Sequence, residues 1–119
     1  IFVSDGYIRA ARGGAGEAKT SGNYGPTLFV SREASANGYT QVLWLDAKER
    51  RFVEEVGTSN IFFCIDDELV TPPLEGTILP GITRDREKER AYHCIALDEG
   101  PAGEADNHTE FRVGTILGL

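Results

Sequence analysis

The stretch QVLWLDAKERRFVEEVGTSNIFFCI, residues 41–65, decides the fold because it holds three strand patterns in close succession. Residues 41–46 form a near-continuous apolar run of strand length, which is typical of a strand that is buried on both faces. Residues 47–50 are polar and turn-like, and the strand pattern resumes over residues 51–56. A third apolar run covers residues 61–65. The stretch therefore predicts a β-rich core.

The flanking segments add further strands. Residues 66–67 predict a turn into a strand at residues 69–71, which would complete a hairpin. Pro72 and Pro73 end that strand, because proline cannot donate to a sheet ladder. Residues 1–10 are rich in β-favouring side chains, and residues 111–119 are typical of a final strand.

Two helices are expected. Asn23 is a candidate N-cap for a helix that runs to about Asn37, and Gly38 is a natural stop. A charged surface helix is expected to begin at about Ile82. Without regular alternation of strands and helices, this order predicts an α+β fold. The first helix has two candidate buried stripes, formed by Tyr24, Leu28 and Ser31 and by Phe29, Val30 and Ala34.

The length and charge exclude several classes of protein. The chain has 119 residues, a length that suits one domain, and a net charge of −7 that argues against nucleic-acid binding. It holds no apolar run near the ~20 residues that span a membrane and no signal peptide, so we expect no membrane contact and a cytoplasmic location. Because the chain begins at Ile1 and lacks Met, we expect it to be a partial product.

The remaining compositional features carry little chemistry. Residues 1–60 sum to zero charge, so the whole −7 lies in the second half, where residues 98–110 are expected to form a solvated acidic loop. Cys64, His93 and Cys94 lack the spacing of a metal site, and we predict no metal.

Lys19 is the first candidate for chemistry. It follows the glycine-rich residues 13–16 and precedes a helix start, where backbone can approach a ligand closely. Desolvation at such a place favours the neutral amine that Schiff-base chemistry needs. The alternative is an ordinary solvated surface lysine.

Glu54 and Glu55 are the second candidates. They lie at a strand end, before small hydrogen-bonding residues, and strand alternation sends them to opposite faces, so only one is expected to point inward. An inward carboxylate needs a partner because its burial alone is costly, and a protonated pyridine nitrogen would be such a partner. The alternative is a pair of edge-strand charges.

The third candidate is an anion site at residues 78–85 (ILPGITRD), where a loop and a glycine precede a helix start. Free backbone N–H groups at a helix N-terminus bind anions, and the Thr83 hydroxyl adds a donor that suits a phosphate. Many helices begin in this way, so the motif alone does not identify a ligand.

Four segments together identify a family. GGAGEAKTSGNYG, QVLWLD, VEEVGTSNIFF and LVTPPLEGTILPGITRD resemble the branched-chain aminotransferases, which are pyridoxal-phosphate enzymes of fold type IV. The resemblance covers about residues 1–86. It implies the β-rich, barrel-like cofactor domain of that class with flanking helices, incomplete here. Residues 1–119 would then be a partial large domain, without the family's small N-terminal domain and with residues 87–110 unlike the family.

The resemblance also implies roles for individual residues. Lys19 would be the Schiff-base lysine, and Tyr24 would contact the O3′ oxygen of pyridoxal 5′-phosphate. Glu55 would face the pyridine nitrogen and keep it protonated, so that the ring acts as an electron sink. The other implied contacts are Leu79 against the ring, Ile82, Thr83 and Thr115 at the phosphate, and Thr58 at the substrate.

The implied reaction exchanges an amino group between Leu, Ile or Val and 2-oxoglutarate, in a homodimer. D-amino-acid transaminases and aminodeoxychorismate lyases of the same fold are alternatives, since they share the lysine, the glutamate and the phosphate loop. An alternative of another class is a catalytically incomplete fragment of the cofactor domain, which folds or binds without turnover.

Overall fold

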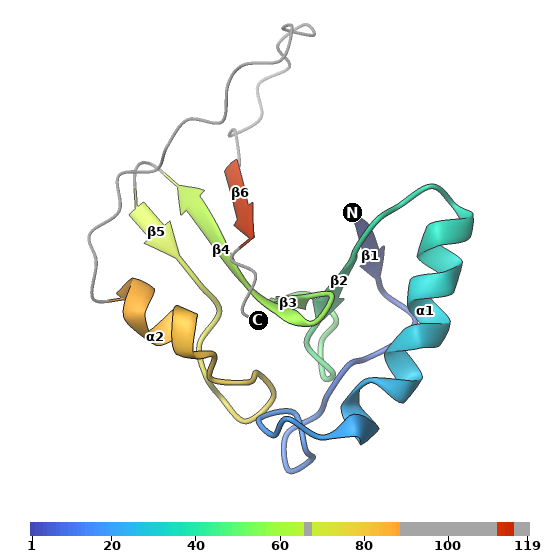
Figure 1. The fold of residues 1–119 in the computed structure, drawn as a ribbon, viewed down its shortest axis with the longest axis horizontal. Helices are drawn as coiled ribbons and strands as arrows, with labels where there is room; N and C mark the ends of the chain where they lie inside the picture. The colour runs from blue at the N-terminus through green and yellow to red at the C-terminus, as the bar shows by residue number, and fades with distance from the viewer. Residues whose placement is uncertain (66–67, 89–111, 116–119) are drawn as a thin grey trace, which may run out of the picture.

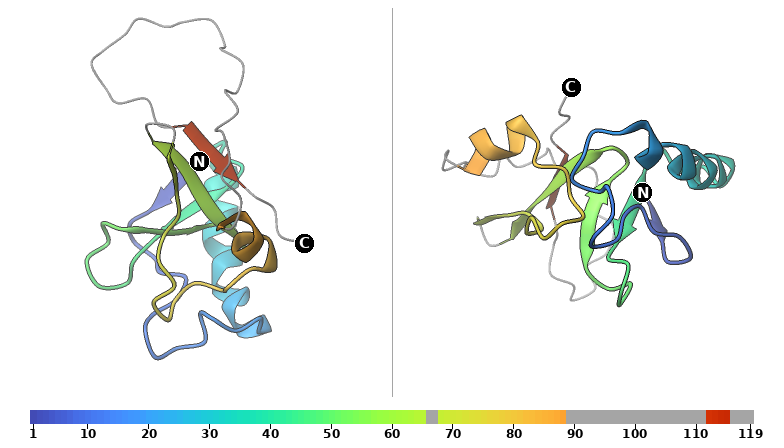
Figure 2. Two further views of the ribbon diagram at one scale, coloured as in Figure 1. Left: turned by 90° about the vertical axis from the view of Figure 1, so that its left-hand side faces the viewer. Right: turned by 90° about the horizontal axis from the view of Figure 1, so that it is seen from below.

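The computed structural model describes residues 1–65, 68–88 and 112–115. Strands form one mixed sheet, and α1 and α2 lie on opposite sides of it (Figures 1 and 2), which confirms the predicted α+β class. In chain order the elements are β1 (Phe2–Ser4), a 3-10 turn η1 (Ser21–Asn23), α1 (Gly25–Ala36), β2 (Val42–Leu45), β3 (Val53–Val56), β4 (Ser59–Ile65), β5 (Glu68–Val70), α2 (Ile82–Lys88) and β6 (Arg112–Thr115).

The sheet has the order β1-β2-β3-β4-β5, and β6 pairs with β4. β1 runs parallel to β2, with α1 in the connection between them, and the other pairs are antiparallel. β4 pairs with β3 only through Ser59 and Asn60 and then continues between β5 and β6 (Figure 1). The predicted hairpin of β4 and β5 and the final strand are confirmed over their described residues.

The start of α1 differs from the prediction. Tyr24, not Asn23, is the residue that precedes the helix. The Asn23 side-chain amide instead donates to the carbonyl oxygens of Ala15 and Ala18, both at 2.7 Å, and so ties the glycine-rich loop to the helix start. At the other end the prediction is confirmed: Gly38 has a φ of +81°, a conformation that glycine adopts without strain.

One stripe of α1 is buried, and it is narrower than the sequence predicts. Val30 and Ala34 pack on Val42 and Trp44 of β2, which together form the core. Leu28 is 64% exposed, so the predicted stripe through it is wrong. The reason is that α1 covers the sheet with a single face, since residues three and four positions apart share a side and Leu28 lies on another.

The hairpin between β2 and β3 fixes the position of the two adjacent carboxylates. Its loop is organised by Asp46, whose carboxylate accepts hydrogen bonds from the N–H groups of Glu49, Arg51 and Phe52 at 2.6–2.9 Å. Trp44 pairs with Glu55 and Leu45 with Val53, so the register shifts and passes over Glu54. This irregularity is a β-bulge, at which strict alternation of side chains fails.

Candidate active site

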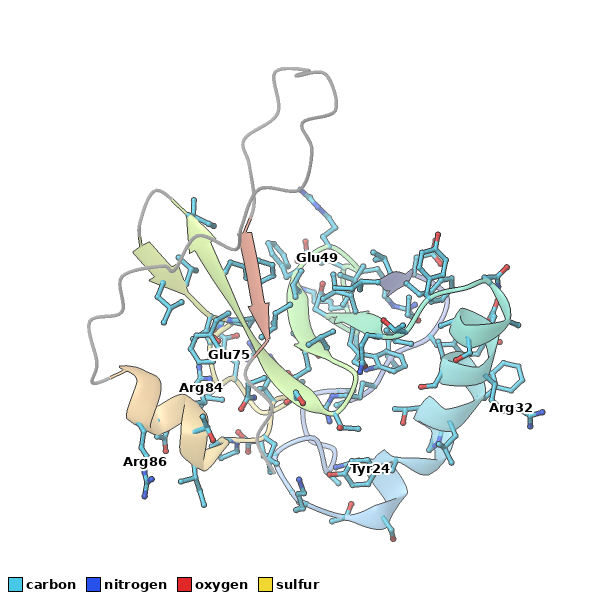
Figure 3. All side chains as sticks on the ribbon, turned by 45° about the horizontal axis from the view of Figure 1, so that its top comes forward. Tyr24, Arg32, Glu49, Glu75, Arg84 and Arg86 are labelled. Carbon is cyan, nitrogen blue, oxygen red and sulfur yellow. The ribbon has the colours of Figure 1, made fainter. Side chains whose placement is uncertain are left out.

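A pocket lies between the glycine-rich loop, the start of α1, the turn after β3, and residues 77–79. It brings together four of the predicted site residues: Tyr24, Glu55, Thr58 and Leu79. Tyr24 reaches it from the start of α1 (Figure 3), and Thr58 from the tight turn between β3 and β4. Segments that are far apart in sequence therefore converge on one site.

Glu55 is the most restrained side chain of this pocket. It is 3% exposed, and its Oε1 accepts hydrogen bonds from the Leu79 N–H at 3.1 Å and the Asn60 side-chain amide at 3.4 Å. The same Asn60 amide donates to the Leu79 carbonyl at 3.0 Å. These bonds hold the carboxylate against the loop, and they use the acceptor capacity of Oε1.

The other oxygen of Glu55 faces a cation. Oε2 lies 2.9 Å from Nε of Arg9, whose side chain is 7% exposed. The contact is an ion pair by distance, and the Nε–H bond does not point along a hydrogen-bond direction. Within the described residues Oε2 accepts no hydrogen bond, so it keeps capacity for a donor on a ligand.

Burial and charge act on Glu55 in opposite directions. Desolvation raises the pKa of Glu55 above its ordinary value, and the charge of Glu54 adds to this rise. Arg9, the Leu79 N–H and, more weakly, Lys19 lower the pKa. Desolvation is the largest of these effects, so the pKa of Glu55 is raised on balance.

Glu54 corrects the expectation that only one of the two carboxylates points inward. It is 9% exposed, and its Oε1 accepts a hydrogen bond of 2.6 Å from the Thr77 hydroxyl. Both carboxylates are thus buried against residues 77–79. The bulge at Glu54 removes the strict alternation on which the expectation was based.

Lys19 lies at the edge of this arrangement. It follows Ala18, which lines the pocket, and its charge is close enough to act on Glu55. Its side chain is exposed, so the structure does not show the desolvation that the sequence suggests.

The predicted phosphate donors lie at the start of α2, outside this pocket. Ile82 is 76% exposed and Thr83 is half-buried. The backbone of Thr115 pairs with Ile61, the residue after Asn60, so β6 begins to approach the site through β4.

Arg84 departs from the expected charged surface helix. It is 1% exposed, and its Nη2 donates to the Pro72 carbonyl at 2.8 Å. In Figure 3 it points toward the sheet, whereas Arg86 points away. The predicted acidic loop at residues 98–110 lies outside the described residues.

Sequence reasoning missed Arg9, Asn60 and Thr77. The signal for Arg9 was indirect: a buried carboxylate needs a cation, and Arg9 is an arginine in an otherwise β-favouring segment. In the described part of the chain, no helix is both long and apolar enough to cross a membrane.

The donor set fits the ring of pyridoxal 5′-phosphate. Glu55 offers an acceptor at Oε2 for a protonated pyridine nitrogen, and Tyr24 offers a phenol. The small residues Gly16, Ala18 and Gly57 line the same pocket and leave room beside these groups.

Comparisons with known proteins agree with this geometry. The chain matches the family described as Amino-transferase class IV over residues 3–101. Branched-chain-amino-acid transaminase 1 of Bacillus subtilis (strain 168) is 58% identical over 84 residues, which are 71% of this chain and 24% of that protein. The chain therefore spans about a quarter of that relative's length.

Two solved structures share the fold. The branched-chain amino acid aminotransferase from Escherichia coli superposes with a TM-score of 0.65 and 37% identity, over 74% of this chain and 29% of that one. A second branched-chain amino acid aminotransferase, complexed with N-(5′-phosphopyridoxyl)-L-glutamate and given the source T.th., superposes with a TM-score of 0.63 and 31% identity, over 74% and 28%. They confirm the predicted class of an incomplete, β-rich aminotransferase domain. The family match and the shared fold lead to one conclusion: this chain belongs to the class IV aminotransferase family.

Proposed function

We propose that this chain is part of the large, cofactor-binding domain of a pyridoxal-phosphate-dependent branched-chain amino acid aminotransferase. The observation that carries the proposal is the restrained carboxylate of Glu55, with an open acceptor at Oε2 in a pocket that Tyr24 and Thr58 also line. The names of the relatives support the substrate class, and the phosphopyridoxyl ligand of one of them supports the cofactor.

Each residue of the site then has a task. Pyridoxal 5′-phosphate supplies an electron sink when it is bound. Glu55 holds the proton on the pyridine nitrogen, and the Tyr24 hydroxyl orients O3′. Lys19 is the lysine that holds the cofactor covalently, and after release it moves a proton between the substrate α-carbon and C4′ as general base and acid.

The other predicted residues bind and orient. Leu79 lies against the ring, and Ile82, Thr83 and Thr115 provide donors to the phosphate. Thr58 contacts the substrate. The amino-group donors are Leu, Ile and Val, the acceptor is 2-oxoglutarate, and the active assembly is a homodimer, as the resemblance implies.

Lys19 gives the sharpest test. The protein is incubated with pyridoxal 5′-phosphate, treated with borohydride and digested, and the modified lysine is located by mass spectrometry. Lys48 is a matched control, since it is also exposed and lies in the loop between β2 and β3. Lys19→Ala should lose both the absorbance band of the bound cofactor and the trapped adduct, whereas Lys48→Ala should keep both. An adduct that persists in Lys19→Ala contradicts the assignment.

Turnover separates the remaining alternatives. The protein is supplied with 2-oxoglutarate and either L-leucine or D-alanine, and glutamate is measured. Glutamate formed from L-leucine supports the branched-chain assignment, and glutamate formed from D-alanine supports the D-amino-acid transaminases. A cofactor band without any turnover supports a fragment that binds only, which is a real alternative because the chain spans 24% of its relative.

A further inference from the structure

Arg9 makes three contacts that the proposed chemistry leaves unexplained. Its Nε lies 2.9 Å from Oε2 of Glu55. Its Nη2 donates to the carbonyl oxygen of Thr77, and it also lies 3.5 Å from the carbonyl oxygen of Gly16. One guanidinium therefore joins a strand carboxylate, the loop at residues 77–79 and the glycine-rich loop that leads to Lys19.

The pairing is buried on both sides. The side chains of Arg9 and Glu55 are 7% and 4% exposed. A second arginine of the same segment provides the contrast, since Arg12 pairs with Glu75 at the surface, with 70% and 53% exposure. Exposed pairs of this kind contribute little, whereas breaking a buried pair leaves an uncompensated charge.

We propose that Arg9 is a positioning residue, which holds Glu55 ionised and oriented so that its Oε2 can accept a hydrogen bond from a protonated pyridine nitrogen. Fixed geometry supports the orientation, because both oxygens of Glu55 are engaged from different sides: Oε1 by the loop and Asn60, and Oε2 by Arg9. The link to the pyridine ring rests on the proposed function, whereas the effect on Glu55 belongs to the chain itself.

The charges around Glu55 make the effect of Arg9 decisive. Burial and Glu54 favour the neutral acid, and a neutral Glu55 cannot stabilise a pyridinium. Arg9 exerts the largest opposing effect, ahead of the Leu79 N–H, while Lys19 contributes less. Once Lys19 is bound to the cofactor its charge no longer has a fixed place near Glu55, so Arg9 is the cation that stays.

The first experiment measures the ionisation of Glu55 without cofactor. The carboxyl carbon of Glu55 is followed by ¹³C NMR as a function of pH in the purified protein, and its signal is assigned by its loss in Glu55→Gln. Arg9→Gln should raise the midpoint by about one to three pH units, the range for loss of an opposite charge within hydrogen-bond distance. Arg9→Lys should recover most of that shift, and Arg12→Gln should leave the midpoint unchanged.

A second measurement needs no variant that must fold. In the unmodified protein, the ¹⁵Nε signal of Arg9 should shift with the same midpoint as the Glu55 carboxyl. If the two signals titrate independently, or if folded Arg9→Gln has the wild-type midpoint, the proposal is wrong.

The third measurement connects Arg9 to the cofactor. The dissociation constant of pyridoxal 5′-phosphate is measured by absorbance across pH, and Arg9→Gln should move the acid limb of binding to higher pH. The same substitution in a Glu55→Gln background should move nothing, because the titrating group is gone. Equal shifts in both backgrounds would show that Arg9 acts only through the fold. If the wild-type protein binds no cofactor at any pH, the proposed function fails, while the NMR titration still decides the role of Arg9.

Discussion

Gly16 offers a quantitative test of how tightly the site is closed. A Cβ added there would lie 2.7 Å from Cβ of Ala10 and 2.8 Å from the carbonyl carbon of Thr77, and it would be closer still to the Thr77 oxygen. Ordinary contacts between carbon atoms are about 3.5–4.0 Å. Two of the three crowded atoms belong to the backbone and cannot rotate away, so the loop at Thr77 must move.

We expect Gly16→Ala to destabilise the protein by about 1–3 kcal/mol, the usual cost of overpacking. Gly25→Ala is the matched control, since Gly25 is the first residue of α1 and a Cβ there meets nothing within 4 Å. Alanine is favoured over glycine in helices by up to about 1 kcal/mol, so this control should be neutral or slightly stabilising.

The assay is urea unfolding of both variants with a common slope, followed by cofactor titration of the folded protein. Arg9 donates to the Thr77 carbonyl and lies near the Gly16 carbonyl, so movement of the loop should also weaken cofactor binding in Gly16→Ala alone. If Gly16→Ala is as stable as Gly25→Ala, the close approach of residues 16 and 77 does not exist in solution and the described pocket is wrong.

Three further predictions concern the rest of the fold. Trp44→Phe should cost about 2–3 kcal/mol in urea unfolding, because it leaves a gap in the core and removes the 3.0 Å hydrogen bond from Nε1 to the Gly57 carbonyl; a loss below ~0.5 kcal/mol would contradict this packing. Backbone N–H groups hold the pKa of Asp46 well below its ordinary 3.8, so its contribution to stability is present above that value and is lost as the pH falls. Asp46→Asn should therefore be less stable than wild type at pH 7, with the difference shrinking in unfolding experiments at pH 3 or below; a pH-independent difference would exclude this origin. Leu28→Ser should change stability by less than ~0.5 kcal/mol, and a large loss would show that this face of α1 is covered in solution.

The sequence predicted local elements well because their signals are local. The apolar runs at residues 41–46 and 61–65 and the stop at Gly38 correspond to β2, β4 and the end of α1. These features depend on side-chain patterns and backbone preferences within a few residues.

Features that depend on distant partners were not predictable in the same way. The parallel pairing of β1 with β2 and the choice of buried face on α1 are decided by packing across the chain. Arg9 and Glu55 are 46 positions apart, and the ion pair between them has no sequence pattern. Arg84 was placed on a surface because it begins a charged run, yet the fold buries it beside Pro72.

The same limit applies to the candidate site. Tyr24, Glu55, Thr58 and Leu79 were singled out from motifs, and the structure places them around one pocket. Their roles toward a cofactor remain predictions, as do those of Lys19, Ile82, Thr83 and Thr115.

The bulge at Glu54 has a consequence for insertions and deletions. Removal of Glu54 would make the ladder between β2 and β3 regular and would remove the carboxylate that binds Thr77. By pairing alone such a deletion would look harmless, since regular ladders are stable without an extra residue. It would nevertheless turn the strand that presents Glu55 relative to Arg9 and Leu79. The length of β3, as well as its composition, is therefore part of what specifies the site, and alignments that place a gap at residue 54 would mark relatives whose carboxylate is held differently.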